Sequence, residues 1–284
     1  MSYFKDRKVT LVDGPAVRTI TQEKGCPQGS VLGPVLWNVV FGELLEMLGQ
    51  CEGVNPVAYA DDLTMVVGGQ TLSQIEHRAQ RAMKIVYEWC AASKMKLSQE
   101  KTCALVGKGS FRDGTPEIWS DTGIPIPFVT ATKYLGISVD RGMKFHTHCQ
   151  VTADKAKNAF HAYRAIARAN WGIQSKQMAL LYKAIFVPRI AYGAGAWAKY
   201  ATRIDLAKLV TAQRAALTTV TRAYRTISTP ALLVAAGEAP IEHALQKEYL
   251  RYAIRTNQAV EIGGTIFDPT ATEAAELVNE LGDA

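Results

Sequence analysis

Two adjacent aspartates at the tip of an expected hairpin constrain this chain more than any other feature. The apolar run Val57-Ala58-Tyr59-Ala60 leads into Asp61 and Asp62, and Leu63–Val67 leads away from them to Gly68-Gly69. This pattern predicts two strands joined by a tight turn. Neighbouring carboxylates repel each other, on the order of 4 kcal/mol at about 4 Å with an effective dielectric constant near 20. The fold must therefore leave the pair in water or supply a cation.

A divalent cation is one solution, and ordinary turn chemistry is another. Mg²⁺ prefers carboxylate oxygens and keeps waters that a phosphate can replace. Two such ions about 4 Å apart can activate a 3′-hydroxyl and stabilise a leaving pyrophosphate. Asp is also common in turns, because its side chain bonds to the local backbone. Taken alone, Asp61 and Asp62 are compatible with a two-metal site and with a solvated turn.

Around this hairpin, the first 140 residues predict a mixture of strands and helices. A turn at Asp13-Gly14-Pro15 joins the first two short strands. A helix is expected from about Gly33 to Gly49, with Ser30 as its cap and Pro34 in its first turn. A longer helix is expected over 71–95, because apolar residues recur there at spacings of three and four. The expected strands outside the aspartate hairpin are Val9–Val12, Val17–Thr21, Thr102–Val106, Ile126–Thr130 and Tyr134–Val139.

From about residue 146 the pattern is helical almost throughout. The expected helical blocks are 147–169, 175–199, 204–224, 229–237 and 241–258. The pattern changes near residue 141, so an α+β first part over 1–140 is expected to precede an all-α region over 141–258. The acidic C-terminal tail, 259–284, is expected to be poorly packed apart from a short helix at Ala271–Leu281.

The net charge of +6 is unevenly distributed along the chain. Residues 150–256 hold 16 Lys or Arg against 5 Asp or Glu, a balance of +11. Residues 257–284 hold no Lys or Arg and 6 Asp or Glu, which leaves +1 for the first 149 residues. A basic excess in one helical stretch indicates a polyanionic partner, although a basic surface can also serve solubility alone.

Other features argue against membrane, secreted and zinc-binding proteins. No apolar run reaches the roughly 18 residues needed to cross a bilayer, and the N-terminus lacks the apolar core of a signal peptide. The cysteines are odd in number and never spaced as C-x-x-C, so we expect reduced thiols in an intracellular protein. They are Cys26, Cys51, Cys90, Cys103 and Cys149. The string His146-Thr147-His148-Cys149 has no second ligand pair at a useful spacing, which argues against zinc.

A glycine-containing string lies about 30 residues before the aspartates. It reads Gly25-Cys26-Pro27-Gln28-Gly29-Ser30-Val31-Leu32-Gly33-Pro34-Val35-Leu36-Trp37-Asn38. Gly29 allows the backbone to approach a nucleotide closely, and Gln28 offers both a donor and an acceptor. The N-terminus of the following helix adds partial positive charge. An ordinary helix cap explains Ser30 to Pro34 but not the whole string.

Together, these two strings resemble the palm of reverse transcriptases. Tyr59-Ala60-Asp61-Asp62 is similar to the family's catalytic signature, and the string around Gln28 resembles its loop-and-helix motif. The resemblance implies that Asp61 and Asp62 are catalytic and hold two Mg²⁺ ions. It also implies substrate or template contacts for Pro27, Gln28, Gly29, Ser30, Tyr59 and Ala60. The expected fold is therefore a partial polymerase palm followed by an all-α thumb and connection region.

Two further strings resemble parts of the same family. Lys96-Leu97-Ser98-Gln99-Glu100-Lys101-Thr102 is similar to a palm segment in which the family places a lysine near the incoming nucleotide, which makes Lys101 the candidate. A solvated surface lysine is the alternative. Lys133-Tyr134-Leu135-Gly136-Ile137 resembles the hairpin that grips the primer strand in this family, which implies a hairpin here and primer contacts for Tyr134, Leu135 and Gly136. A core strand with a bulge at Gly136 is the alternative, and both interpretations can hold.

Several strings in the helical half narrow the family. They are Leu181–Ile185, Tyr192–Trp197, Gln213-Arg214, Ala223–Leu232 and Ala236–Ile241. These resemble the region after the palm in insect non-LTR retrotransposons, especially the type-1 elements that insert into ribosomal DNA. The resemblance spans roughly residues 9–257. It implies weak contacts to a nucleic-acid backbone for Arg214, Arg222 and Arg225, and a solvated helix face is the alternative.

The resemblance implies an RNA-directed DNA polymerase that uses an RNA template, a DNA primer and deoxynucleoside triphosphates. The primer would be nicked chromosomal DNA, which places the action in the nucleus. Two alternatives remain: a group II intron maturase, which shares the palm motif, and a non-catalytic nucleic-acid-binding remnant. RNA splicing would favour the first alternative, against which the string Ala223–Ala231 argues. Salt-dependent RNA binding without nucleotide incorporation would favour the second. No oligomeric state is indicated.

The family also has parts that this sequence does not match. It needs a third aspartate on a strand before the glutamine-glycine loop, and neither Asp6 nor Asp13 has that context. The fingers, the endonuclease of full-length elements and the downstream Cys/His knuckle are unmatched as well. We therefore expect the isolated 284 residues to be an incomplete enzyme with little or no polymerase activity. Primer extension on an RNA template with Mg²⁺ measures this, and efficient extension would contradict it.

Overall fold

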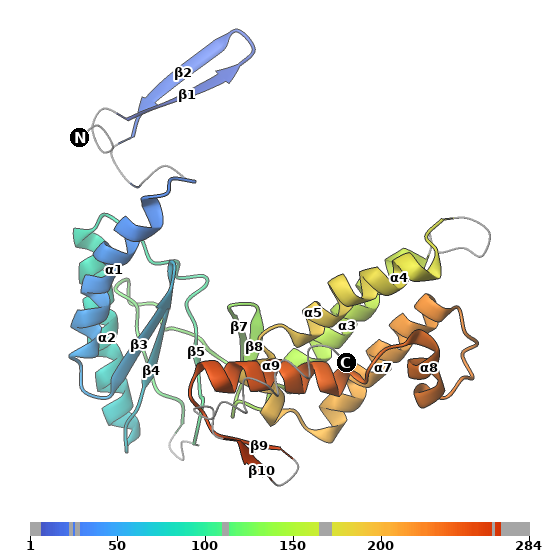
Figure 1. The fold of residues 1–284 in the computed structure, drawn as a ribbon. Helices are drawn as coiled ribbons and strands as arrows, with labels where there is room; N and C mark the ends of the chain where they lie inside the picture. The colour runs from blue at the N-terminus through green and yellow to red at the C-terminus, as the bar shows by residue number, and fades with distance from the viewer. Residues whose placement is uncertain are drawn as a thin grey trace. The chain divides into compact units, whose positions relative to one another are not determined.

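A computed structural model shows a mixture of helices and small antiparallel sheets, as expected for an α+β chain (Figure 1). The structure describes residues 7–22, 25, 29–109, 114–164, 172–262 and 265–267. The chain forms two compact units, Met1–Ala104 with Ser110–Phe128, and Leu105–Gly109 with Val129–Ala284. None of the described helices has the length and apolar character needed to cross a lipid bilayer.

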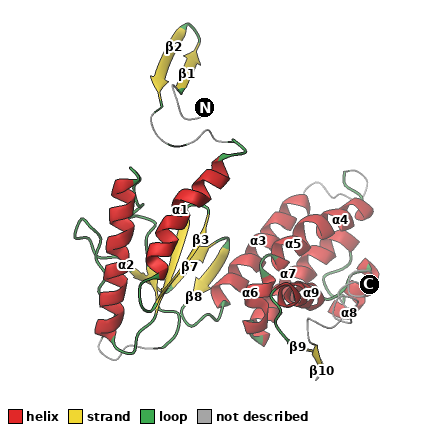
Figure 2. Cartoon of the chain, turned by 60° about the vertical axis from the view of Figure 1, so that its left-hand side comes forward, coloured by secondary structure: helices red, strands yellow, loops and turns green. Residues whose placement is uncertain are grey.

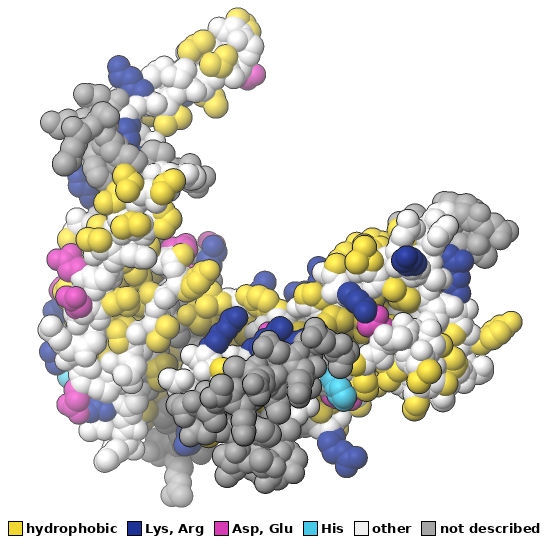
Figure 3. All heavy atoms as spheres, in the orientation of Figure 1, with side chains coloured by type: hydrophobic (Ala, Val, Ile, Leu, Met, Phe, Trp, Pro, Cys, Tyr) yellow, Lys and Arg dark blue, Asp and Glu magenta, His cyan; other side chains and the backbone are white. Residues whose placement is uncertain are grey.

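The first unit begins with the predicted hairpin of β1 (Lys8–Asp13) and β2 (Ala16–Thr21). Asp13 pairs with Ala16, so Gly14 and Pro15 form a two-residue turn. Gly14 has φ +56°, the conformation that the first position of such a turn requires. Every residue of both strands is exposed, and hydrophobic side chains lie on the hairpin surface (Figure 3).

The core of the first unit lies between two helices and one face of a second hairpin (Figure 2). The helices are α1 (Gly33–Gly49) and α2 (Leu72–Ala92), and the strands are β3 (Val54–Tyr59) and β4 (Asp62–Val67). The predicted apolar stripe of α2 is confirmed, because its buried residues are Ala79, Ala82, Met83, Val86 and Trp89. Ala82, Val86 and Trp89 share one core cluster with Phe41, Leu44 and Leu48 of α1.

The two helix starts differ in how they are capped. The prediction that Ser30 caps α1 is wrong, because Leu32 occupies the N-cap position and makes no side-chain cap bond. Pro34 lies in the first turn of α1, where its missing N–H leaves no bond unmade. In α2, by contrast, the Thr71 hydroxyl accepts a hydrogen bond from the Gln74 amide. A side-chain cap therefore starts only the second helix.

The short strands of the middle segment depart from the prediction. Strands β5 (Ala104–Leu105) and β6 (Phe128–Val129) have two residues each, shorter than expected. The strand predicted over Tyr134–Val139 is wrong, because β7 (Ala131–Tyr134) and β8 (Ile137–Asp140) form a hairpin, as the resemblance of Lys133–Ile137 to the primer-gripping hairpin implies. Its turn residues Leu135 and Gly136 have φ +46° and +86°. Positive φ at both turn positions lets a two-residue loop match the strand twist.

The second unit is mainly helical, and its helices follow the predicted order (Figure 1), whereas the short hairpin after the last of them was not predicted. The elements are α3 (His146–Arg164), α4 (Ser175–Leu181), the π-helix η1 (Tyr182–Phe186), α5 (Val187–Ala191), α6 (Ala194–Trp197), the 3₁₀-helix η2 (Ala198–Tyr200), α7 (Arg203–Thr221), α8 (Thr229–Ala236), α9 (Ile241–Arg255), β9 (Val260–Ile262) and β10 (Thr265–Phe267). The predicted block 175–199 is interrupted by a turn at Tyr192 and Gly193, where Gly193 has φ +62°. The helix expected at Ala271–Leu281 lies outside the described residues.

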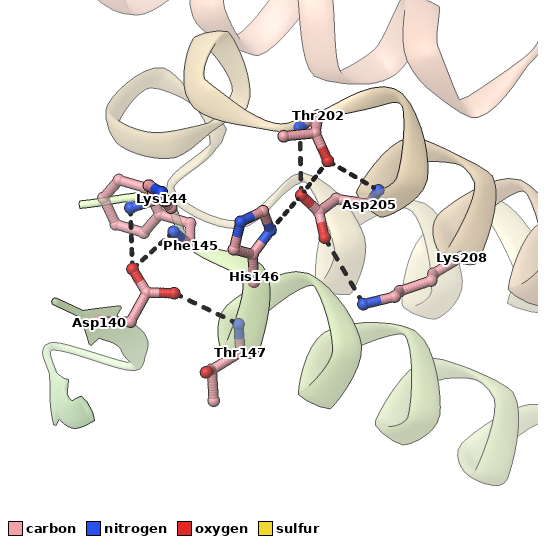
Figure 4. Close-up of polar contacts among 8 residues, drawn as sticks. All are labelled: Asp140, Lys144, Phe145, His146, Thr147, Thr202, Asp205 and Lys208. Atoms are coloured by element: carbon pink, nitrogen blue, oxygen red, sulfur yellow. Dashed lines mark hydrogen bonds and ion pairs between the residues drawn. The ribbon is translucent and has the colours of Figure 1, made fainter. Parts of the chain in front are cut away.

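Hairpin β7–β8 belongs to this second unit rather than to the part expected to end near residue 140. Ile137 and Val139 pack against the helical core. Asp140, at the end of β8, accepts hydrogen bonds from the Lys144 and Phe145 amides at 2.8 Å (Figure 4). The hairpin thereby caps the start of α3, which explains why it packs with the helices.

A buried glutamine and a glycine fix the packing of the later helices. The Gln213 side chain, 1% exposed, donates to the Tyr182 hydroxyl at 2.9 Å and to the Ala239 carbonyl at 2.8 Å. Burial raises the pKa of Tyr182 to about 12. A Cβ atom at Gly195 of α6 would overlap Tyr252 of α9. Close helix contact at this point therefore requires glycine.

The starts of α3 and α7 are joined by one buried carboxylate (Figure 4). The Asp205 side chain is 1% exposed and accepts hydrogen bonds from the Thr202 hydroxyl at 2.6 Å and from the His146 ring at 2.7 Å. Lys208 lies 3.6 Å from the same carboxylate. Burial opposes ionisation of Asp205, but the bonds from Thr202 and His146 outweigh it and lower its pKa. The charged carboxylate is thus a structural link between two helices.

We expect Asp205→Asn to lower the free energy of unfolding by about 2 kcal/mol near neutral pH, because hydrogen bonds to a charged group contribute roughly 1.5–3 kcal/mol. The folded-state pKa of Asp205 is depressed. Its contribution is therefore present above the unfolded value of about 3.9 and is lost as pH falls through the folded value. Urea denaturation across this range measures the effect, and the difference from the wild type should shrink in acid.

Asp154→Asn is the matched control, since Asp154 is exposed and accepts one hydrogen bond from Gln150 on the same helix. That change should alter stability by less than about 0.5 kcal/mol. Equal stability of the Asp205→Asn and wild-type chains at neutral pH would show that the carboxylate does not join the helices.

Candidate active site at the β3–β4 hairpin

The β3–β4 hairpin places the two aspartates at its tip. The strands pair antiparallel from Val54 opposite Val67 to Tyr59 opposite Asp62, which leaves Ala60 and Asp61 as the two-residue turn. Alternate residues point to opposite faces of a strand. Asp62 therefore shares the outer face with Tyr59, whose side chain is 66% exposed, while the other face packs on α1 and α2.

The turn has an unusual backbone that a tryptophan holds in place. Ala60 has φ +52°, a left-handed conformation that costs a residue with a Cβ atom on the order of 1 kcal/mol. Its carbonyl accepts a hydrogen bond from the Trp37 indole N–H at 2.7 Å. Trp37 stacks on Phe41 with 5.0 Å between ring centroids, and Phe41 meets the edge of Trp89 at 5.4 Å. The turn is therefore tied to the core through α1.

Both aspartate carboxylates are available to a cation. Asp61 and Asp62 are exposed, and within the described ranges neither carboxylate makes a hydrogen bond or ion pair. Two unpaired carboxylates on one turn fit a hard divalent ion, which binds one or two carboxylates and completes its shell with water and phosphate. No group of three metal-ligating side chains occurs in the part of the chain that the structure describes.

The glycine-containing string before α1 is only partly described. Pro27 and Gln28 lie outside the described residues. Gly29 has φ +81°, so this position requires the freedom of glycine. The Ser30 carbonyl accepts a hydrogen bond from the Gly33 amide at 3.3 Å, which forms a turn before the helix. The string continues into α1, whose Trp37 side chain contacts the aspartate turn. The end of the first motif therefore lies beside the second motif in the structure.

The Lys101 side chain is exposed on a turn that follows Ser98, whose carbonyl accepts the Lys101 amide at 3.3 Å. No contact in the described part of the chain joins its ammonium group to the aspartate hairpin. A role for Lys101 near a nucleotide therefore stays a prediction.

Tyr192, which is not among the candidate site residues, holds the β7–β8 turn in place. The Tyr192 hydroxyl donates to the Leu135 carbonyl at 3.0 Å. A Cβ atom at Gly136 would lie 3.0 Å from the Tyr192 ring. Tyr134 and Leu135 are half-buried and Gly136 is exposed, so only the tip of this turn presents backbone to solvent. The interpretation as one strand with a bulge at Gly136 is wrong.

The three candidate arginines differ in their surroundings. The Arg214 guanidinium points into the protein, where it donates to the Thr229 hydroxyl at 3.0 Å and to the Arg225 carbonyl at 2.8 Å. Arg222 ends α7 with φ +57° and donates to the Ile173 carbonyl at 3.1 Å. The Arg225 side chain is exposed. Arg214 therefore supports the structure, and Arg225 is the best placed of the three for a phosphate.

The string His146–Cys149 has structural contacts. His146 bonds to Asp205, and the Ser138 amide donates to Nδ1 of His148 at 3.2 Å. The His148 ring meets the edge of Trp197 at 5.0 Å, and burial lowers the pKa of His148. Cys149 is fully buried, and burial raises its pKa to about 12. A protonated buried thiol is a poor metal ligand.

Similarity to known proteins bears directly on the aspartate hairpin. The family described as reverse transcriptase (RNA-dependent DNA polymerase) matches residues 2–139. A putative 115 kDa protein in the type-1 retrotransposable element R1DM of Drosophila melanogaster is 30% identical over 261 residues. A retrovirus-related Pol polyprotein from the type-1 retrotransposable element R1 of Bradysia coprophila is 33% identical over 242 residues. An RNA-directed DNA polymerase from the mobile element jockey of Drosophila funebris is 26% identical over 203 residues.

The matches cover 92%, 84% and 67% of this chain in that order. They cover only 25%, 24% and 21% of the relatives, so the chain spans about a quarter of their length. These names favour the retrotransposon interpretation over a group II intron maturase. The chain belongs to the reverse transcriptase family, as a segment related to the Pol polyproteins of non-LTR retrotransposons.

Proposed function

We propose that this chain supplies part of the active site of an RNA-directed DNA polymerase, with its first unit as a partial palm and its second as a thumb and connection region. The observation that carries the proposal is the pair of unpaired carboxylates, Asp61 and Asp62, at a hairpin tip that Trp37 ties to the core through the Ala60 carbonyl. Because the chain is similar to reverse transcriptases and to an RNA-directed DNA polymerase of a mobile element, nucleotidyl transfer is the reaction that such a turn would serve.

In this mechanism, Asp61 and Asp62 would hold Mg²⁺ at the hairpin tip. The bound ion would supply the charge that lowers the pKa of a primer 3′-hydroxyl and stabilises the developing charge on the phosphate. The Trp37 hydrogen bond restricts the turn, so the carboxylates do not need to reorganise during the reaction. The exposed ring of Tyr59, on the same face as Asp62, offers a flat surface beside the reacting groups. The backbone at Ala60, Gly29 and Ser30 completes the proposed substrate contacts.

The remaining candidate residues would contact the nucleic acid or the nucleotide. The tip formed by Tyr134, Leu135 and Gly136 would contact the primer strand, and Lys101 the incoming nucleotide. Arg222 and Arg225 would contact phosphates, whereas the contacts of Arg214 favour a supporting role. The substrates would be an RNA template, a DNA primer and deoxynucleoside triphosphates, used at a nicked chromosomal target in the nucleus.

A non-catalytic nucleic-acid-binding segment is the second candidate function. The observation that favours it is that only two neighbouring carboxylates meet at the hairpin, with no third metal-ligating side chain near them among the described residues. The two candidates differ in one property, because only the polymerase requires Asp61 and Asp62 for its activity.

Replacing the aligned segment of the Bradysia coprophila Pol polyprotein by this chain allows that requirement to be measured. We expect primer extension by the chimera to fall at least about 100-fold in Asp61→Asn and Asp62→Asn, because metal ions contribute several kcal/mol of charge stabilisation. Asp13→Asn, on the exposed first hairpin, is the matched control and should leave the rate unchanged. Extension that survives both site variants would exclude the catalytic proposal and favour the binding segment.

Trp37→Phe keeps the ring that stacks on Phe41 but removes the N–H that bonds to the Ala60 carbonyl. We expect the free energy of unfolding to fall by about 1 kcal/mol, the usual contribution of one hydrogen bond. The affinity of the 284-residue chain for Mn²⁺, measured by electron paramagnetic resonance, should fall several-fold as the turn loosens. Trp119→Phe, at a half-exposed position of the same unit, is the control. Unchanged Mn²⁺ affinity in Trp37→Phe would rule out a positioning role.

A further inference from the structure

The loop between α7 and α8 presents an aromatic ring to solvent. Tyr224 is 88% exposed, whereas Ala223 and Ile227 of the same loop pack against the core of the second unit. The loop therefore has anchored residues on both sides of an outward-facing tyrosine. Packing within the described part of the chain therefore does not explain why a large aromatic side chain occurs at position 224.

The backbone around Tyr224 is held by several hydrogen bonds. The Ile227 amide donates to the Tyr224 carbonyl at 3.2 Å, which closes a turn. The Arg214 guanidinium donates to the carbonyls of Arg225 and Ile227 and to the Thr229 hydroxyl. The conformation of the loop is thus set before any ligand arrives, and a preorganised loop loses little conformational entropy on binding.

The charge around this loop favours an anionic ligand. Residues 214–237 contain three basic side chains and no acidic one. They are Arg214, Arg222 and Arg225. The Arg225 side chain follows Tyr224 directly and is exposed. An aromatic ring beside a guanidinium fits a ligand that combines flat bases with phosphates.

We propose that Tyr224 stacks on an unpaired base of a single-stranded nucleic acid while Arg225 contacts an adjacent phosphate. The assignment deepens the proposed function, on which it rests for the class of ligand, but the site lies in the second unit and does not involve the aspartates. A single strand is favoured over a duplex, because only unpaired bases expose both faces to a side chain. Arg214 acts as a positioning residue for the loop.

The test measures binding of fluorescein-labelled oligonucleotides of about 16 nucleotides to the 284-residue chain by fluorescence anisotropy. The probes are single-stranded RNA, single-stranded DNA of the same sequence and the corresponding blunt duplex. Tyr224→Ala should weaken binding of single strands about 10-fold, while Tyr224→Phe should bind like the wild type. Duplex binding should be unchanged in both variants. Preference for RNA over DNA among the single strands would identify which polymer the loop takes.

Two further variants separate stacking from charge and from general surface loss. Arg225→Gln should reduce the slope of log affinity against log salt by about 0.7, the loss of one phosphate contact on a single strand, whereas Tyr224→Ala should leave the slope unchanged. Val234→Ala is the matched control, because Val234 is 84% exposed on α8 and lacks an aromatic ring. It should not alter affinity.

Equal affinity of Tyr224→Ala and wild type for single strands would overturn the proposal, as would absence of single-strand binding by the wild type. An equal loss in Val234→Ala, or an equal loss for duplex, would point to an apolar protein contact or to altered folding instead. Asp61→Asn separates this result from the proposed polymerase function: it should abolish primer extension by the chimera without changing the Tyr224-dependent binding. A negative result for the Tyr224 site therefore does not contradict the polymerase proposal, and the reverse also holds.

Discussion

The pairing register of β3 and β4 is the constraint on which the candidate site depends. Side chains alternate between the two faces of a strand, so a slip of one residue would turn Leu63 and Met65 away from the core and bring Asp62 and Thr64 into it. Burying an unpaired carboxylate is costly, which opposes that slip. The core of the first unit thereby determines that the acidic turn faces solvent.

That register also forces the turn itself. With Tyr59 opposite Asp62, only Ala60 and Asp61 remain to reverse the chain, and Ala60 takes up a left-handed backbone. The indole of Trp37 bonds to its carbonyl, and stacking on Phe41 holds the indole. Core packing thus stabilises an unfavourable turn. This turn lies beside Asp61 and Asp62, the two side chains that we propose as metal ligands. Strain of this kind is typical of functional sites.

In the second unit, buried polar groups determine how the helices pack. Several of its helices, among them α4, α5 and α6, are short, so apolar contact alone allows many neighbouring arrangements. Asp205 joins α3 to α7, and Gln213 joins α7 to η1 and to the start of α9. Arg214 in turn holds the loop that carries Tyr224. Each of these groups bonds only in one arrangement, because a buried donor or acceptor without a partner is expensive.

Local patterns in the sequence determined the helices α1, α2, α3 and α7, the hairpin at residues 54–67 and the string Tyr59-Ala60-Asp61-Asp62. Periodicity and residue order are properties of chain neighbours, so no tertiary contact is needed to read them. Two predictions of continuous elements failed, one for the strand Tyr134–Val139 and one for the unbroken block 175–199. In both segments, apolar residues continue through the turn. The hydrophobic pattern therefore does not reveal the positive φ angles at which the chain reverses. Only the tertiary structure decided that Trp37 reaches Ala60, that Tyr192 fastens Leu135 and that Arg214 points inward, since these bonds join residues far apart in sequence whose approach depends on packing of the whole unit.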